Sequence, residues 1–297
     1  MTGRSSAAYT GVMGLIVVSG ATGRLGGQIA GRLADAGLEQ RLIVRDPGRA
    51  PVLAGAEVAV AEYGDPAALR RALAGAGTVL MVSAAETPDR VRQHHNFVDA
   101  AVAAGVERLV YTSFVGAAPD AVFTLARDHW ATEEYIRASG LEFTFLRDNL
   151  YADFLPFLVG DDGVIRGPAG DGRAAVVAQA DIADAAAAVL RDPLPHARRS
   201  YDLTGPEALT FTDMAAVITS ATGRKVTFVN ETLDEAYASR ASYGAPGWQV
   251  DAWVSTYTAV AAGELSTVSP AVEQLTGHPA TSLSELLRNR PSRPLSR

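Results

Sequence analysis

Six short apolar runs alternate with helix-like patterns through the first half of this 297-residue chain. The runs have the length of buried parallel strands, and they lie at residues 15–19, 41–44, 57–61, 78–82, 108–112 and 143–146. Apolar residues at helical spacing occupy the intervals 25–36, 66–73, 89–104 and 125–138. This alternation predicts an α/β fold built on a Rossmann-type doubly wound parallel sheet. Ligands of such sheets bind outside the carboxyl ends of the strands, so the segments that follow each strand form the candidate site.

The strand–helix rhythm ends after residue 146. Residues 149–175 are rich in Gly, Asp, Phe and Tyr, and the later helical segments are separated by Gly and Pro. Those helical segments lie at 181–191, 211–222, 233–242, 252–262 and 282–289. We therefore predict a Rossmann domain over residues 14–148 and a smaller C-terminal α/β substrate lobe over 149–288, with some of its elements returning to the first sheet.

Short polar segments flank these two parts. Residues 1–13 are small and polar, and they predict a disordered N-terminal extension with Met1 and Met13 as alternative starts. The Arg-, Pro- and Ser-rich residues 289–297 predict a flexible tail.

Composition excludes several classes of function. The absence of cysteine rules out a disulfide scaffold, a thiolate metal site and a cysteine nucleophile. A net charge of −7 is a poor match for nucleic acid. No apolar run is long enough for a signal peptide or a membrane span, so we predict a cytoplasmic protein without a membrane partner. His94 and His95 are interpreted as surface helix, and with no partners at ligand spacing we predict no metal site.

The glycine-rich segment 20–26 directly follows the first predicted strand and opens the first predicted helix. Glycines at such a turn let backbone N–H groups approach a pyrophosphate, which the N-terminus of the helix then stabilises. The strand–turn–helix context favours a dinucleotide site over an ordinary glycine-rich turn. The predicted contacts are Gly20, Thr22, Gly23, Arg24, Leu25 and Gly26.

The residue that ends the second strand indicates which dinucleotide binds. A site that prefers NAD places a carboxylate here for the ribose 2′-hydroxyl, whereas Arg45 offers a cation for the 2′-phosphate of NADPH. Arg24 supplies a second possible contact. In the alternative, Arg45 is a solvated strand end and Asp46 binds the ribose. We predict NADPH.

Polar residues follow three further strands at the same edge. Asp65 is expected to cap the next helix and to border the adenine. Ser83 and Ala84 follow the fourth strand and Ser113 follows the fifth, and these residues are expected near the ribose and nicotinamide.

The proton donor of such a site cannot be the usual tyrosine. No tyrosine has a lysine four residues later, and Lys225 is the only lysine in the chain. A Tyr–Lys acid pair is therefore absent. His129, at the start of the helix after the fifth strand, is a candidate for cofactor contact and for proton donation. The alternative is a histidine in a polar cleft without catalytic duty.

Residues after the sixth strand supply the candidate acceptor site. Asn149 offers amide donors, and Tyr151, Phe154 and Phe157 offer flat apolar surface suited to an aromatic substrate. The alternative is that these rings anchor the second lobe. With His129, Asn149 and Tyr151 form the predicted catalytic set.

The chain resembles the NmrA-like, atypical branch of the short-chain dehydrogenase/reductases, and within it the bacterial type-2 NADPH:quinone oxidoreductases. The resemblance extends over residues 14–288, in segments whose shared order is specific. They are 20–26, 44–47, 62–65, 111–113, 129–140, 143–147, 167–173, 180–181, 201–205 and 275–279.

This resemblance implies an NADPH-binding Rossmann domain with the substrate held between it and a small C-terminal domain. The positions that match its cofactor contacts are Gly20, Thr22, Gly23, Leu25, Gly26, Arg45, Ser83 and Ser113. A missing Tyr–Lys pair is normal there, because a quinone takes hydride without it. His129 stands where some relatives have lysine. Residues 148–150, Asp-Asn-Leu, depart from the Asn-Gly-Trp of the resembling proteins, so the acceptor loop differs.

Taken together, the sequence predicts an NADPH-dependent oxidoreductase that passes hydride to a quinone or a quinone-like aromatic acceptor. The first alternative is a ketoreductase that acts on a fused-ring, polyketide-type ketone in a tailoring pathway. The second is a non-catalytic NAD(P) sensor that reports redox state to a protein, as some NmrA-like proteins do. A homodimer is an open alternative for the assembly.

Overall fold

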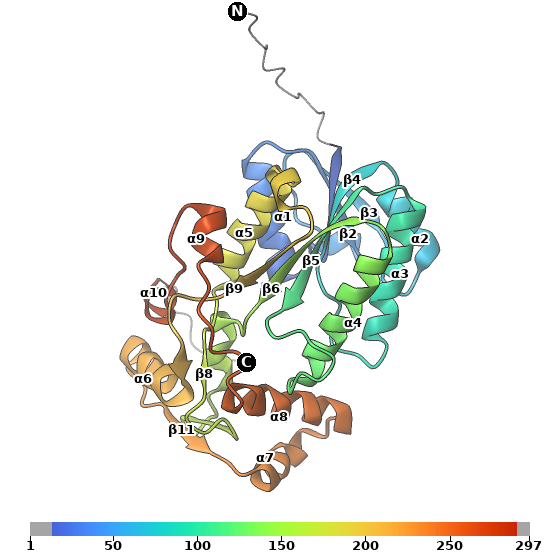
Figure 1. Cartoon of the computed structure of the whole chain (residues 1–297). Coiled ribbons are helices and arrows are strands. Elements are labelled where there is room, and N and C mark those ends of the chain that lie inside the picture. The colour runs from blue at the N-terminus through green and yellow to red at the C-terminus, as the bar shows by residue number, and fades with distance from the viewer. Residues whose placement is uncertain (1–13, 290–297) are drawn as a thin grey trace, which may run out of the picture.

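Seven parallel strands form the central sheet in the order β3-β2-β1-β4-β5-β6-β9, in a computed structural model that describes residues 14–289 (Figure 1). Six of them overlap the predicted apolar runs, which confirms the doubly wound fold. The strands are β1 Leu15–Ser19, β2 Gln40–Val44, β3 Ala56–Val60, β4 Ala76–Met81, β5 Arg108–Phe114, β6 Glu142–Asp148 and β9 Arg199–Leu203. The predicted extension over 1–13 and residues 290–297 of the predicted tail lie outside the described residues.

Helices cover both faces of this sheet. One face carries α1, α5 and α9, and the other carries α2, α3 and α4 (Figure 1). Ile29 and Leu33 of α1 are fully buried against the first face, and Leu69 and Leu73 of α2 are fully buried against the second. The bounds are α1 Arg24–Asp35, α2 Pro66–Leu73, α3 Arg90–Ala103, α4 Thr124–Ala138, α5 Gln179–Arg191 and α9 Ala271–Thr276.

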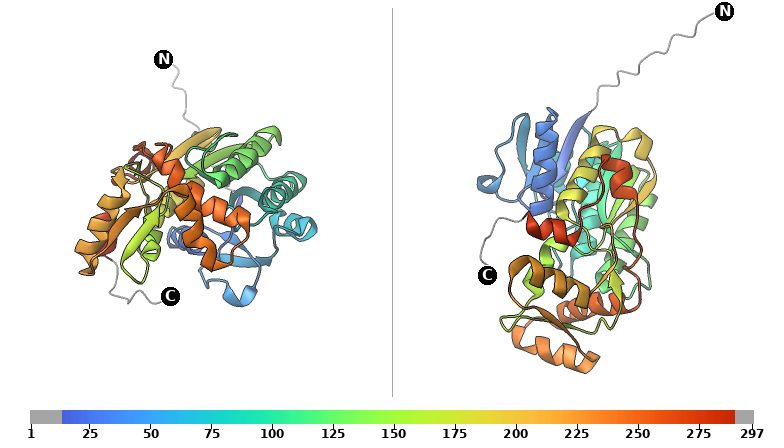
Figure 2. Two further views of the ribbon diagram at one scale, coloured as in Figure 1. Left: turned by 90° about the horizontal axis from the view of Figure 1, so that it is seen from below. Right: turned by 90° about the vertical axis from the view of Figure 1, so that its left-hand side faces the viewer.

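The smaller lobe lies beyond the ends toward which the central strands point, at the bottom of Figure 1, and Figure 2 shows it from below and from the side. It contains two small sheets, β8 with β10 and β7 with β11. Phe211 and Met214 of α6 pack with Tyr257 of α8 in its core. The elements are η2 Ala152–Leu158, β7 Val164–Gly167, β8 Arg173–Ala174, β10 Leu209–Thr210, α6 Phe211–Thr222, β11 Thr227–Asn230, α7 Leu233–Arg240, α8 Gly247–Ala261 and α10 Leu283–Arg288.

The seventh strand of the central sheet, β9, follows the first elements of the smaller lobe in the sequence. After β6 the chain forms η2, β7, β8 and α5, and it then returns as β9, which pairs in parallel with β6. The apolar pattern of the sequence does not reveal this strand. Arg199 and Ser200 are exposed and β9 lies at the edge of the sheet, so it lacks the apolar run of a buried strand.

Two further observations complete the fold. Helix α8 begins at Gly247 rather than at residue 252, since Pro246 takes the position before its first turn. Across residues 14–289, every helix falls short of the length and apolar character that a membrane-spanning helix requires.

Candidate active site

The glycine-rich turn between β1 and α1 is shaped by two close approaches. Gly20 has φ +65°, a conformation that favours glycine, and its carbonyl accepts a hydrogen bond from Gly23 N at 2.9 Å. A Cβ on Gly26 would lie 2.4 Å from the oxygen of Gly20, so α1 packs directly on the turn. Among residues 14–289 no side chain caps α1, so its first N–H groups have the orientation to bind a ligand. The turn therefore has the geometry of an anion site.

Two exposed arginines flank this turn. Arg45 follows β2. The carboxylate of the next residue, Asp46, accepts a hydrogen bond from Gly48 N at 2.9 Å and caps a short 3-10 helix. Asp46 thus has a local capping role, and Arg45 is exposed beside it. Arg24, the first residue of α1, lies over the rings of Phe154 and Phe157 at 5.7 and 5.8 Å.

The ends of β1, β3 and β4 are joined by hydrogen bonds. The hydroxyl of Tyr63 donates to Val82 O at 2.6 Å and lies 2.7 Å from Ser19 Oγ. Ser19 Oγ in turn accepts from Val82 N at 2.9 Å. Burial raises the pKa of Tyr63, so its hydroxyl stays protonated. Asp65 accepts from Ala68 N and caps α2, which confirms its predicted cap role.

The predicted residues after β4 and β5 are held by the surrounding framework. Ser83 N donates to Thr112 Oγ1, and Ala84 N donates to Nε2 of His94. Ser113 Oγ donates to Glu133 Oε1 at 2.6 Å. The Ser113 hydroxyl is therefore directed at a buried carboxylate.

Glu133 explains why the hydroxyl of Ser113 turns that way. Its side chain is fully buried, and Arg147 and Arg137 donate to it from two sides. A buried carboxylate requires such partners, because burial without them is costly. The cluster fixes β5, β6 and α4 beside the site.

His94 corrects one prediction. It was expected on the surface of its helix, but it is fully buried, because its ring joins two elements. Nε2 accepts from Ala84 N at 2.8 Å and Nδ1 lies 2.8 Å from Thr132 Oγ1. Burial and the nearby Arg90 hold its pKa well below the usual range. His95, by contrast, stacks on Tyr135 with its ring centroid 3.8 Å away.

His129 lies in a buried network at the start of α4. Nη2 of Arg90 lies 3.0 Å from its Nε2, and the hydroxyl of Tyr111 lies 2.9 Å from its Nδ1. Burial first, and then the charge of Arg90, holds the pKa of His129 well below its usual range. The ring is therefore neutral and accepts from Arg90, which leaves only a Nδ1 proton that is committed to Tyr111. This geometry does not support proton donation by His129.

Asn149 also differs from its predicted role. Its side chain is fully buried, and Nδ2 donates to Leu265 O at 3.0 Å. Its Oδ1 accepts from Leu150 N at 2.7 Å. Both ends of the amide thus bond to the backbone where the chain passes from β6 into the lobe. The buried side chain does not reach a substrate in this arrangement.

The predicted aromatic residues line one cavity of about 800 Å³. Tyr151, Phe154 and Phe157 border it as expected, which brings three of the four predicted acceptor residues to one place. Four further rings, which the sequence analysis missed, complete the wall, and they are Phe211, Tyr243, Trp253 and Tyr257. Phe211, Trp253 and Tyr257 come from segments whose helical pattern was visible, and Tyr243 directly follows one, but the pattern alone does not show which face meets the cavity.

Two arginines also line this cavity. Arg166 pairs with Asp162 near the surface. Arg240 is buried, pairs with Glu231 at 3.0 Å and lies over the ring of Tyr257 at 5.2 Å. None of the residues that line the cavity is acidic.

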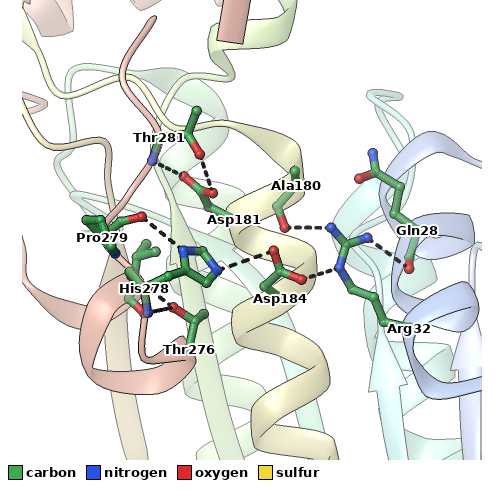
Figure 3. A network of polar contacts seen from close by, with 10 residues as sticks. Gln28, Arg32, Ala180, Asp181, Asp184, Thr276, His278, Pro279 and Thr281 are labelled. Atoms are coloured by element: carbon green, nitrogen blue, oxygen red, sulfur yellow. Dashed lines mark hydrogen bonds and ion pairs between the residues drawn. The ribbon is translucent and has the colours of Figure 1, made fainter. Parts of the chain in front are cut away.

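A second polar cluster joins α5 to α1 and to the segment after α9 (Figure 3). Asp181, Asp184 and His278 lie close enough to hold a metal ion. Asp181 accepts from the backbone and hydroxyl of Thr281 at 2.7 and 2.8 Å, while Asp184 pairs with Arg32 and lies 3.5 Å from His278. Each carboxylate thus already has protein partners, and the cluster is a structural joint.

Comparison with known proteins places these features in context. A model of the NmrA-like family matches residues 13–241. The chain is 36% identical to quinone oxidoreductase 2 of Escherichia coli over 278 residues, which is 91% of this chain and 96% of that protein. It is 30% identical to an NAD(P)H azoreductase of Xenophilus azovorans over 279 residues, 92% of this chain and 97% of that protein.

A solved structure of the Escherichia coli protein is also similar to this chain. The crystal structure of the NADPH-dependent quinone oxidoreductase of Escherichia coli in complex with NADPH matches with a TM-score of 0.84 and 36% identity. The match covers 92% of this chain and 98% of the other.

Proposed function

This chain belongs to the NmrA-like family, and we propose that it is an NADPH-dependent reductase of a quinone or a quinone-like aromatic acceptor. The relatives named above are a quinone oxidoreductase and an azoreductase by name, which supports an acceptor of the quinone-like class. A cytoplasmic location and a homodimer stay predictions.

The observation that carries the proposal is the contact between the cofactor turn and the aromatic cavity. Arg24 begins α1 and lies over Phe154 and Phe157, which border the cavity. Tyr151 borders the same cavity and packs against the core that contains Ala21 of the turn. An acceptor in this cavity would lie beside the turn that holds the cofactor pyrophosphate, and closeness of the two ligands is one requirement of hydride transfer.

The residues at the ligand edge of the sheet suit NADPH. The turn at 20–26 offers backbone N–H groups to the pyrophosphate, and Arg45 offers a guanidinium to the 2′-phosphate. Asp65, Ser83 and Ala84 stay predicted contacts along the rest of the cofactor. NADPH, when bound, supplies the hydride, and the chain contributes position and surrounding polarity.

The test is NADPH consumption with a panel of quinones and fused-ring ketones, and with NADH as the control cofactor. Multiple turnovers with quinones and a preference for NADPH are expected. Turnover with the ketones alone would favour the ketoreductase, a candidate that the altered residues 148–150 support. Cofactor binding without turnover of any acceptor would favour the sensor.

A further inference from the structure

Asp148 is a buried carboxyl group without a cationic partner. It is the last residue of β6, at the ligand edge of the sheet, and it is 1% exposed. Its Oδ2 lies 2.8 Å from the hydroxyl of Tyr151. Its Oδ1 is buried and has no hydrogen-bond partner among residues 14–289. Glu133, by comparison, is equally buried and has two arginines.

Such a group is most stable as the neutral acid. Burial is the main cause that raises the pKa of Asp148 to about 8, and the hydrogen bond with Tyr151 lowers it only in part. The charged groups nearby interact with one another rather than with Asp148. Arg147 on β6 pairs with Glu133, and Asp202 on β9 faces that pair. Arg90 on α3 and Tyr111 on β5 act on the hydroxyl of Tyr151. At pH 7 Asp148 therefore holds a proton.

Tyr151 connects this carboxyl to the acceptor site. Its side chain borders the aromatic cavity, and its hydroxyl is hydrogen-bonded to Asp148. When Asp148 is protonated, it can donate to the Tyr151 oxygen, and the hydroxyl proton of Tyr151 is then available to a ligand. When Asp148 is ionised, the same hydroxyl donates to the carboxylate instead. The state of Asp148 thus decides where the tyrosine proton points.

We propose that Tyr151 gives a proton to the reduced acceptor, and that Asp148 positions this hydroxyl and replaces its proton. The proposal rests on the proposed reductase function. Hydride transfer from NADPH leaves an oxyanion on the acceptor. The O–H bond of Tyr151 breaks as the acceptor O–H bond forms, and the O–H bond of Asp148 breaks as that of Tyr151 is restored. Asp148 is left as a carboxylate and takes a proton from solvent after the product leaves.

This pair replaces the absent Tyr–Lys acid by different chemistry. A neutral carboxylic acid keeps the tyrosine proton directed at the acceptor, where a lysine cation would lower the tyrosine pKa. A reduced quinone and a reduced ketone each carry an oxyanion that such a donor can protonate. The acceptor class therefore extends to carbonyl compounds conjugated with a ring.

The test measures single-turnover oxidation of NADPH by a quinone from pH 6 to pH 9.5, in the wild type, Asp148→Asn and Tyr151→Phe. The wild-type rate is expected to fall above about pH 8. Asp148→Asn keeps the shape and a donor to Tyr151 but cannot release a proton, so its rate at pH 7 should drop at least about tenfold and the alkaline fall should vanish. Tyr151→Phe should show the same loss of rate at pH 7, at least about tenfold relative to the wild type.

Two matched variants control for loss of fold. Asp202→Asn changes a partly buried carboxyl whose pKa is also raised by burial, and Tyr201→Phe removes another hydrogen-bonded hydroxyl. Both should keep the wild-type profile. In the cofactor-free protein, infrared spectra at pH 7 should show a protonated carboxyl band that Asp148→Asn lacks and both controls keep.

The outcomes separate the two proposals. Wild-type turnover that stays constant through pH 9.5, a wild-type rate in Asp148→Asn, or an absent carboxyl band would overturn the role of the pair and leave the reductase intact. An absence of turnover with every quinone and ketone would overturn the reductase itself.

Discussion

Arg45 stands exposed where β2 ends, and the neighbouring Asp46 is occupied by Gly48 N. Replacing Arg45 by Asp should move cofactor preference from NADPH toward NADH by on the order of 1–3 kcal/mol, because a charge-assisted contact to the 2′-phosphate is exchanged for a carboxylate. Dissociation constants for both cofactors measure this shift. An unchanged affinity for NADPH would assign the phosphate contact to another residue.

Asp148 also predicts how stability depends on pH. Its folded pKa of about 8 lies above the ordinary value of 3.8, so the folded chain keeps a proton that the unfolded chain releases. The contribution of Asp148 to the free energy of unfolding is fully present below about pH 4 and is lost as the pH rises toward 8. Relative to the wild type, Asp148→Asn should therefore gain roughly 1 kcal/mol of unfolding free energy per pH unit between pH 5 and 8. Urea unfolding at four pH values measures the difference, and parallel curves would contradict it.

His129 and Asn149 show what sequence can predict about single residues. Their position at the ligand edge followed from the strand pattern, and the structure places both there. Their roles did not follow, because each depends on partners that are distant in sequence. Arg90 lies 39 residues from His129 and Leu265 lies 116 residues from Asn149. No local pattern reveals such contacts.

At the scale of elements, the turn between β1 and α1 offers a paired test. Gly26→Ala places a Cβ 2.4 Å from the Gly20 oxygen, so the turn must move and NADPH affinity should fall at least about tenfold. Gly31→Ala on the same helix meets nothing within 4 Å and should stabilise the protein by about 0.5–1 kcal/mol. Isothermal titration and thermal unfolding of both variants check the pair. Equal NADPH affinity in the two variants would show that the close approach of Gly26 to the Gly20 oxygen does not matter for cofactor binding.

The elements themselves were predicted to different degrees. Helix α2 was predicted at its observed bounds, because Asp65 and Pro66 mark its start and its apolar residues have helical spacing. Strands β8 and β10 were not predicted, since each has two residues and exists only through pairing with the other. Sequence periodicity identifies elements long enough to show a repeat.

At the scale of the whole molecule, the cluster in Figure 3 joins α5 to the segment after α9. Asp181 is 1% exposed and accepts two hydrogen bonds from Thr281. Asp181→Ala leaves the Thr281 N–H without a partner and should cost about 1–3 kcal/mol of unfolding free energy. Asp184→Ala removes partly exposed ion pairs with Arg32 and His278 and should cost less than about 1 kcal/mol. Urea unfolding distinguishes them, and equal costs would contradict the assignment of the joint to Asp181.

The return of the chain as β9 has a consequence for synthesis and for evolution. The sheet is complete only when residue 203 of 297 has been made, after part of the lobe has already emerged. No single cut separates a self-sufficient cofactor half from an acceptor half, because α5 and β9 belong to the first and follow the start of the second. Exchanging everything after one cut point at the start of the lobe would therefore also replace α5 and β9 of the central layers. Substitutions inside the lobe change the acceptor site and leave the path of the chain through the sheet intact.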